Sequence, residues 1–153
     1  NAKNSSIMIL PLSKKFIWKK YKKIIASGLL IDDSTPDEKV HELRIECKKL
    51  RYLLEFFSTL YPGDKISTII SQLKKLQDNL GDFNDYYVQQ ESLADMLSEL
   101  NNKDSNYSDI TMSVGGLIAI LSSKQNEVRK EFKQRFSEFA RKENQELYGK
   151  LFS

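Results

Sequence analysis

Residues 36–60 read PDEKVHELRIECKKLRYLLEFFSTL. Apolar residues recur in it at helical spacing, at Leu43, Leu50, Leu53, Leu54, Phe57 and Leu60. A period near 3.6 residues predicts a helix with one face in a core. Pro36 is suited to the first turn of that helix, with Thr35 before it as a cap. The sequence therefore predicts a helix over residues 36–60.

A second set of residues marks the other side of the same helix. His41, Arg44, Lys48 and Arg51 are spaced by three, four and three positions. At about 100° per residue they fall within roughly 80° of one another. We call these four residues the basic stripe. A stripe of three cations and one imidazole on a core-packed helix favours binding of a polyanion over covalent chemistry.

The remaining chain shows the same helical periodicity. Further helices are predicted at about residues 13–30, 65–80, 84–100 and 109–148. Gly81 is expected to end or bend the third helix, residues 82–84 to form a tight connection, and Asn84 to cap the fourth. Residues 101–108 are polar and predicted to be a loop. Long helices with short connections predict an all-α fold, an antiparallel bundle of four to five helices that includes a long C-terminal helix.

The composition fits one helical domain. The chain has 153 residues, 40% hydrophobic and 29% charged, with six Gly and three Pro. These values favour a soluble globular protein. The net charge is only +3, so a polyanion site must depend on how the cations are placed. The single Cys47 excludes an internal disulfide and is expected to pack as a small hydrophobe. No apolar run approaches the ~20 residues of a membrane span.

Other cations could extend the basic stripe. Candidate residues are Lys15, Lys19 and Lys22 on the first helix, Lys74 on the third, and Arg129 and Lys133 on the last. The alternative is that these residues form ordinary solvated helix faces, with Arg51 paired to Glu55 one turn later. Gln77 falls on an apolar face, so we expect its side chain to be hydrogen-bonded inside the bundle.

His41 is the only histidine. One histidine without a cysteine cluster cannot build a typical structural zinc site, so no metal or cofactor is expected. His41 is either a hydrogen-bonding residue near the helix start or a phosphate ligand that gains charge when protonated. The sequence shows no glycine-rich phosphate loop and no nucleophile with a placeable base.

Two segments resemble a known family. Residues 41–57, HELRIECKKLRYLLEFF, and residues 76–85, LQDNLGDFND, resemble the two signatures of the CHAD family, the conserved histidine α-helical domain. The resemblance implies a helical module that binds inorganic polyphosphate through basic surface residues. By position, it assigns His41, Arg44, Lys48 and Arg51 to the family's basic helix, with Tyr52 following in the same motif. Family members are associated with polyphosphate granules, which implies a cytoplasmic protein.

The resemblance also bears on domain organisation. CHAD modules usually hold two related helical bundles, and only one copy is visible, similar to the C-terminal one. Residues 3–153 are therefore expected to be half of a module, whose partner is a second bundle of the same protein or a second copy. The chain does not begin with Met, and Asn1-Ala2 is interpreted as a cloning-tag remnant.

The expected function is non-catalytic binding of inorganic polyphosphate, with no membrane partner. One alternative is a protein–protein interaction module with a basic docking face. Another is a nucleic-acid-binding bundle, which is disfavoured because few aromatic residues besides Tyr52 interleave with the stripe. A phosphatase or phosphotransferase that uses His41 ranks last.

Overall fold

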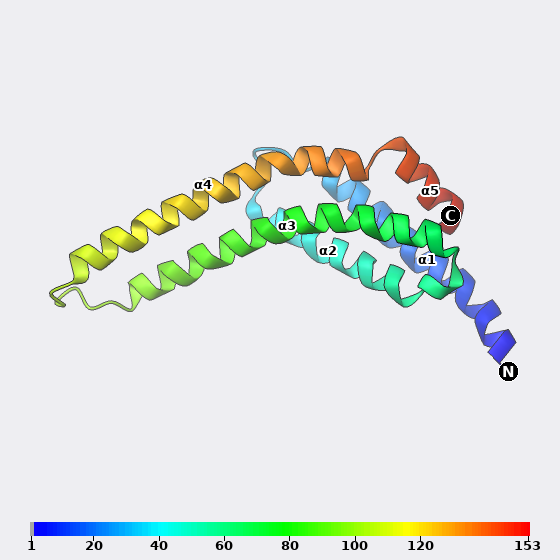
Figure 1. Ribbon diagram of the computed structural model, residues 1–153, viewed down its shortest axis with the longest axis horizontal. Coiled ribbons are helices and arrows are strands. Elements are labelled where there is room, and N and C mark those ends of the chain that lie inside the picture. The colour runs from blue at the N-terminus through cyan, green and yellow to red at the C-terminus, as the bar shows by residue number, and fades with distance from the viewer. Residues whose placement is uncertain (1) are drawn as a thin grey trace. The chain divides into compact units, whose positions relative to one another are not determined.

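The computed structural model describes the backbone of residues 2–153 and the side chains from Met8 onward. Its elements are α1 (Ala2–Leu29), α2 (Asp37–Phe56), the 3-10 helix η1 (Ser58–Leu60), α3 (Gly63–Ser98), α4 (Tyr107–Phe139) and α5 (Lys142–Phe152) (Figure 1). No strand occurs in residues 2–153, so the predicted all-α class is confirmed. Of the two residues interpreted as a tag remnant, Asn1 lies outside the described residues and Ala2 begins α1.

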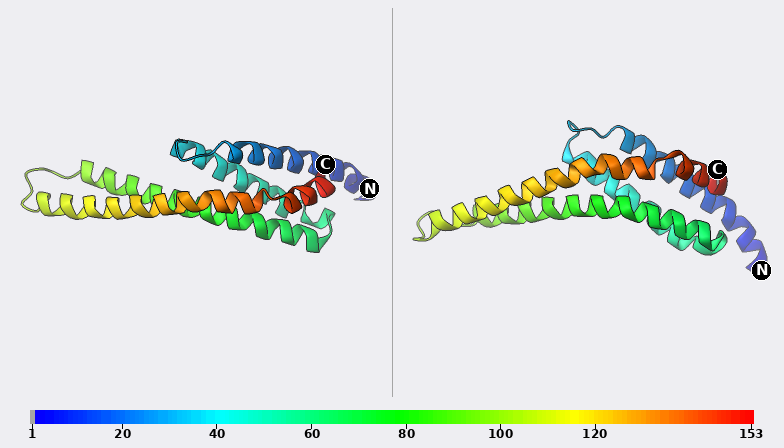
Figure 2. Two further views of the ribbon diagram at one scale, coloured as in Figure 1. Left: turned by 90° about the horizontal axis from the view of Figure 1, so that it is seen from above. Right: turned by 45° about the horizontal axis from the view of Figure 1, so that its top comes forward.

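The chain forms two compact units. The first takes in the residues up to Asp78 together with Gln134–Ser153, and the second is Asn79–Lys133. In the first unit α1 and α2 run side by side in opposite directions (Figure 1). In the second unit the C-terminal part of α3 and most of α4 form an antiparallel pair (Figure 2). No helix in the described part of the chain is both long and apolar enough to cross a bilayer.

The core of the first unit follows the predicted apolar faces. The buried residues are Ile17, Tyr21 and Ile24 of α1, Leu43, Cys47, Leu50 and Leu54 of α2, and Ile66, Ile69, Leu73 and Leu76 of α3. Their i, i+3, i+4 and i+7 spacing places one apolar stripe of each helix inward. Burial of these stripes fixes the opposite faces toward solvent, which positions the cations of α2.

Aromatic side chains pack α1 against α5 and the end of α4. Tyr21 of α1 stacks on Tyr148 of α5, with ring centroids 3.9 Å apart and planes 7° from parallel. Phe139 meets Tyr21 edge-on at 6.0 Å. Gly28 of α1 touches this region because it has no side chain: an added Cβ would lie 2.0 Å from the ring of Phe136. Close approach of α1 to the end of α4 therefore requires glycine at this position.

In the second unit, α3 and α4 pair through buried apolar residues and through hydrogen bonds of side-chain amides. Phe83, Val114 and Phe132 are buried. The Asn79 Nδ2 donates to the carbonyl oxygen of Val128 at 3.0 Å, and the Gln90 Nε2 donates to the Gln125 Oε1 at 2.8 Å. Because two helices alone bury one stripe each, such amide contacts specify how they pair.

The helix predicted over residues 109–148 is divided into two. α4 ends at Phe139, and the separate helix α5 begins at Lys142. The Asn144 side-chain amide donates to the carbonyl oxygens of Glu138 and Phe139, each at 3.2 Å. An asparagine that binds nearby backbone groups competes with continued helix. The break turns α5 so that Tyr148 meets α1.

The predicted connection at residues 82–84 and the cap at Asn84 are wrong. α3 continues through Gly81 as one helix from Gly63 to Ser98. Leu80 and Phe83 are both buried, so the apolar face persists across the glycine. A single Gly costs only about 1 kcal/mol in a helix, which this burial offsets. The polar loop predicted at residues 101–108 is confirmed to within two residues.

Three helix ends differ from the prediction. α1 begins at Ala2, not at Ser13, and runs through Pro11. α2 ends at Phe56, after which Ser58–Leu60 tighten into η1. Pro36 itself is the cap position of α2, while the Thr35 hydroxyl accepts the Asp32 N–H at 2.9 Å and closes the preceding turn. The threonine oxygen thus serves the connection and not the helix start.

Candidate functional site

The basic stripe lies on the flank of α2 that faces α3. His41, Arg44 and Arg51 are partly buried, and Lys48 is exposed. The Arg51 Nη1 donates to the Gln77 Oε1 of α3 at 3.4 Å. Gln77 is therefore hydrogen-bonded between two helices of the first unit, as its apolar-face position predicted. This contact fixes the side of α2 on which the stripe lies.

Arg51 is held from two directions. Its Nε donates to the Glu55 Oε1 at 2.9 Å, one turn later on α2, in addition to the contact with Gln77. The predicted Arg51–Glu55 ion pair is thus present. A guanidinium has more N–H donors than these two contacts use. The arrangement orients the Arg51 plane while leaving donors for an anion.

Lys48 and Arg44 carry the centre of the stripe. In the part of the chain that the structure describes, neither forms an ion pair. The Lys48 Nζ lies 5.9 Å from the ring centroid of Tyr52, whose side chain is 55% exposed. The ring lies one turn beyond the lysine and favours a cation above it. Two cations and an oriented guanidinium therefore share one solvent-facing surface.

Lys74 lies beside this surface. It is exposed and precedes Gln77 by one turn of α3, so both project from the same side of that helix. Since Arg51 reaches Gln77, the side of α3 that carries Lys74 adjoins the stripe. A polyanion leaving the stripe can meet Lys74 next.

The lysines of α1 lie elsewhere. Lys20 and Lys23 bond to Glu46 of α2, with Nζ–oxygen distances of 2.6 and 3.2 Å. Helical spacing places Glu46 about 180° from the centre of the stripe, on the other flank of α2. Of the predicted α1 residues, Lys19 lines a hollow with Leu53 on that flank.

Lys15 and Lys22 are exposed on the solvent side of α1, and the Lys22 Nζ lies 5.6 Å from the Trp18 ring. Thus the structure does not bring the α1 lysines beside the stripe. Arg129 and Lys133 belong to the second unit, where Arg129 is partly buried and Lys133 is exposed.

A separate basic hollow was not predicted from the sequence. Its volume is about 250 Å³, and its lining includes Lys75 of α3, Arg135 of α4 and Arg141 of the connection before α5, with Glu138 between them. The Arg135 Nη1 lies 3.7 Å from Glu138. Helical periodicity could not predict this grouping, because the three cations lie on α3, on α4 and in the connection that follows the break after Phe139.

The pKa values of Glu46 and Cys47, which are neighbours on α2, are both shifted. Burial raises the pKa of the Glu46 carboxyl, but hydrogen bonds from Lys20 and Lys23 and their charges outweigh it, so that the pKa is lowered overall. Burial raises the pKa of the Cys47 thiol to about 12, with the nearby Glu46 charge adding to the effect. Cys47 is a buried free thiol, as its position predicted. The described residues hold no group of three or more His, Cys, Asp or Glu placed to bind a metal ion.

Comparison with known protein families gives a match. No curated protein matches the chain. The family model of the CHAD domain matches residues 2–94, which is more than half of the chain and includes α1, α2 and most of α3. The basic stripe, Gln77 and Lys74 all lie within the matched residues. The chain therefore belongs to the CHAD domain family.

Proposed function

We propose that this protein binds inorganic polyphosphate along the basic stripe of α2, without catalysis. CHAD domains are associated in general with polyphosphate-related proteins. The observation that carries the proposal is the arrangement of Arg44, Lys48 and Arg51 on one surface, with Arg51 oriented by Glu55 and Gln77.

The shape of the surface suits a linear ligand. His41 and Arg51 are ten residues apart, which is about 15 Å along the helix axis. Lys74 of α3 continues the line of charge. A row of cations on an open helix surface can bind successive phosphates of a chain, whereas a compact ligand would need a closed pocket. Arg supplies paired donors to phosphate oxygens, and Lys supplies a mobile point charge.

The chemistry available also favours binding over cleavage. At neutral pH the Cys47 thiol stays protonated because its pKa is raised to about 12, so it supplies no thiolate. His41 lies on the stripe, where we assign it to contact phosphate oxygens. Release of phosphate that disappears in His41→Ala would overturn the non-catalytic assignment.

Neighbouring lysines on α2 provide a matched test. Lys48 and Lys49 are both exposed, but Lys48 belongs to the stripe, whereas the Lys49 Nζ lies 3.9 Å from Glu46 on the other flank. We expect Lys48→Ala to weaken binding to long-chain polyphosphate and to lower the salt slope by about one, because one phosphate contact is lost. Lys49→Ala removes the same charge and should change neither quantity as much.

The assay is a titration of the 153-residue chain with polyphosphate over a salt series, with single-stranded RNA as competitor. Salt-sensitive binding that RNA displaces poorly supports the proposal. Equal losses in Lys48→Ala and Lys49→Ala would mean that net charge, not the stripe, determines binding.

The proposal extends to the cellular site. A polyphosphate-binding surface would recruit the protein to cytoplasmic polyphosphate granules, alone or beside a second bundle of the same kind. A fluorescent fusion should co-localise with the granules, and Lys48→Ala with Arg51→Ala should disperse it while the Lys49→Ala fusion stays.

A further inference from the structure

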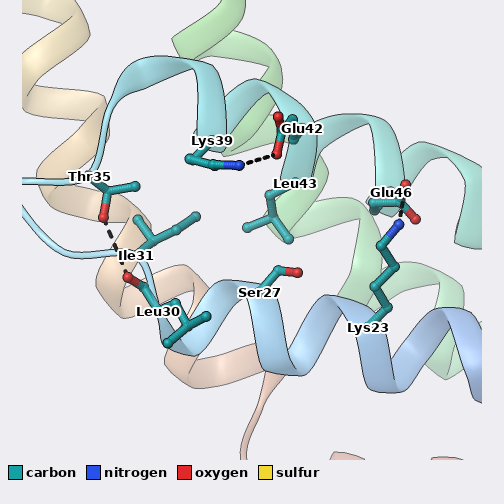
Figure 3. Close-up of a pocket in the computed structure, with 9 residues that line it drawn as sticks. All are labelled: Lys23, Ser27, Leu30, Ile31, Thr35, Lys39, Glu42, Leu43 and Glu46. Atoms are coloured by element: carbon teal, nitrogen blue, oxygen red, sulfur yellow. Dashed lines mark hydrogen bonds and ion pairs between the residues drawn. The ribbon is translucent and has the colours of Figure 1, made fainter.

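Two hollows lie along the junction of α1 and α2, on the flank of α2 opposite the basic stripe. One of about 480 Å³ is lined by Phe16, Lys19, Lys20, Lys23 and Leu53. The other, also about 480 Å³, lies between the end of α1 and the start of α2, and its nine lining residues are drawn in Figure 3. Lys23 borders both hollows. We call the two together the α1–α2 groove.

Large apolar side chains line the groove without being covered. Phe16 in the first hollow is 45% exposed, and Leu30 in the second is 79% exposed. Ile31, which is partly buried, projects between the two helices above the buried Leu43 (Figure 3). Covering apolar area is worth roughly 25 cal/mol per Å², so a partner that fills the groove gains free energy from these residues.

The polar groups around the groove carry an excess of positive charge. Four lysines line the two hollows, Lys19, Lys20, Lys23 and Lys39, against the two acids Glu42 and Glu46. Glu46 is 13% exposed and binds Lys20 and Lys23, while Glu42 pairs with Lys39 at 3.1 Å. Lys19 is exposed on the rim. A ligand that complements the groove must therefore be apolar toward its floor and acidic toward its rim.

We propose that the α1–α2 groove binds an acidic amphipathic helix of a partner protein. A third helix can pack lengthwise along the junction of α1 and α2. Its apolar face can cover Phe16 and Leu53 while its carboxylates meet Lys19 and Lys23. Phe16 and Ser27 mark the two hollows on α1 and lie about 16 Å apart along the helix axis. The partner helix therefore needs two apolar anchors about three turns apart.

Other ligands fit the groove less well. Linear polyphosphate has no apolar part to cover Phe16 or Leu53. A bilayer surface is flat on this scale and cannot reach between two packed helices. The groove lies on the flank of α2 opposite the basic stripe, so the proposal is independent of polyphosphate binding.

The test uses a fluorescent synthetic helical peptide with two leucine anchors about eleven residues apart, glutamates beside them, and a scrambled peptide of equal composition as control. Binding to the 153-residue chain is followed by anisotropy. We expect the patterned peptide to bind and the scrambled one not to. Phe16→Ala and Lys19→Glu should each weaken binding at least about fivefold, because one removes an anchor contact and the other reverses a rim charge.

Two variants serve as matched controls. Lys22→Glu makes the same charge change on the side of α1 that carries Trp18, about 120° around the helix from Phe16, and Lys48→Ala alters the basic stripe; both should bind the peptide as wild type does. Phe16 and Lys19 are exposed enough that circular dichroism should show native helix content in their variants. Equal binding of the scrambled peptide, equal losses in Lys19→Glu and Lys22→Glu, or binding to phosphatidylserine vesicles without binding to the peptide would each overturn the proposal.

Discussion

The two flanks of α2 both meet cations, but they use them differently. On the α1 flank, the partly buried Glu46 takes the charges of Lys20 and Lys23. On the α3 flank, Arg51 is oriented by Glu55 and Gln77, and the adjacent Lys48 stays exposed. Lys20 and Lys23 are paired with an acid across two helices, whereas Lys48 of the second flank faces solvent and pairs with no acid among the described residues. A count of lysines and arginines cannot distinguish these roles; the position of the nearest acid does.

The largest effect on stability is expected from a substitution that forces α1 away from Phe136. In Gly28→Ala the new Cβ would lie 2.0 Å from the ring of Phe136, which is buried. We expect the variant to lose about 1–3 kcal/mol of unfolding free energy, because a packed aromatic ring must move. Urea unfolding followed by circular dichroism measures the loss.

Gly81→Ala is the control for this substitution. An added Cβ at Gly81 meets no atom within 4 Å, so alanine should stabilise α3 by about 0.5–1 kcal/mol. If Gly28→Ala unfolded at the wild-type urea midpoint, close packing of α1 on Phe136 would be refuted.

A second substitution removes the acid on the α1 flank of α2, so that the lysines there lose their ion-pair partner. Glu46→Gln removes the charge that Lys20 and Lys23 bind, and we expect it to cost about 1–2 kcal/mol of stability. It should also raise the affinity for polyanions, because two lysines lose their acid. Glu42→Gln is the control: Glu42 is exposed and pairs with Lys39 within one helix, so its loss should cost under about 0.5 kcal/mol. Equal effects of the two variants would contradict the special role of Glu46.

The pH dependence of stability gives a further test of the ion pairs that Glu46 forms with Lys20 and Lys23. The pKa of Glu46 in the folded protein is lowered from an ordinary value of 4.5, so its carboxylate stabilises the fold fully above that value. The contribution is lost as the pH falls from about 4.5 toward the lower folded-state pKa. The stability difference between wild type and Glu46→Gln should therefore be constant near neutral pH and shrink in acid. A difference that grew in acid would have the wrong sign for this ion pair.

A smaller effect is expected on the α3 flank. Gln77→Leu removes one of the two contacts that orient Arg51. If the stripe binds polyphosphate, affinity should fall about two- to fivefold, less than in Arg51→Ala, because the charge remains but its plane is freer. The titration described for Lys48→Ala gives the comparison. A loss as large as that of Arg51→Ala would indicate that Gln77 itself contacts the ligand.

The smallest effect concerns the residue between the two flanks. Cys47 is buried, and burial raises its pKa to about 12. The native protein should therefore react negligibly with a thiol reagent at neutral pH and become labelled in step with urea unfolding. Fast labelling of the folded chain would contradict the packing of α2 against the core.

Much of this fold could be predicted from the sequence, because apolar residues that recur at helical spacing are buried in the structure. On α2 the buried Leu43, Leu50 and Leu54 belong to the predicted apolar face, and the Arg51–Glu55 pair was foreseen as an alternative role of Arg51. The two main errors arose from local signals that the packing overrode or created. Gly81 is a helix breaker by propensity, but burial of Leu80 and Phe83 carries the helix through it. The break before α5 depends on Asn144, whose contacts with two carbonyls have no sequence signature.

The candidate site was predictable only within one helix. The spacing of His41, Arg44, Lys48 and Arg51 is fixed by the α-helix itself, so the stripe could be read directly. Which flank of α2 meets α1 depends on how the two helices pack. For that reason Lys19 was grouped with the stripe, and the hollow beside Arg141 was not foreseen.

The stacking of Tyr148 on Tyr21 has a consequence for how the protein is made. The two rings belong to segments far apart in the chain, so on the ribosome Tyr21 emerges long before its neighbour exists. Until α5 is synthesised, the nascent chain exposes an aromatic surface of α1 that the finished protein covers. The first unit therefore cannot complete its folding before α5 has left the ribosome, and a chain stopped before α5 would present that surface to chaperones.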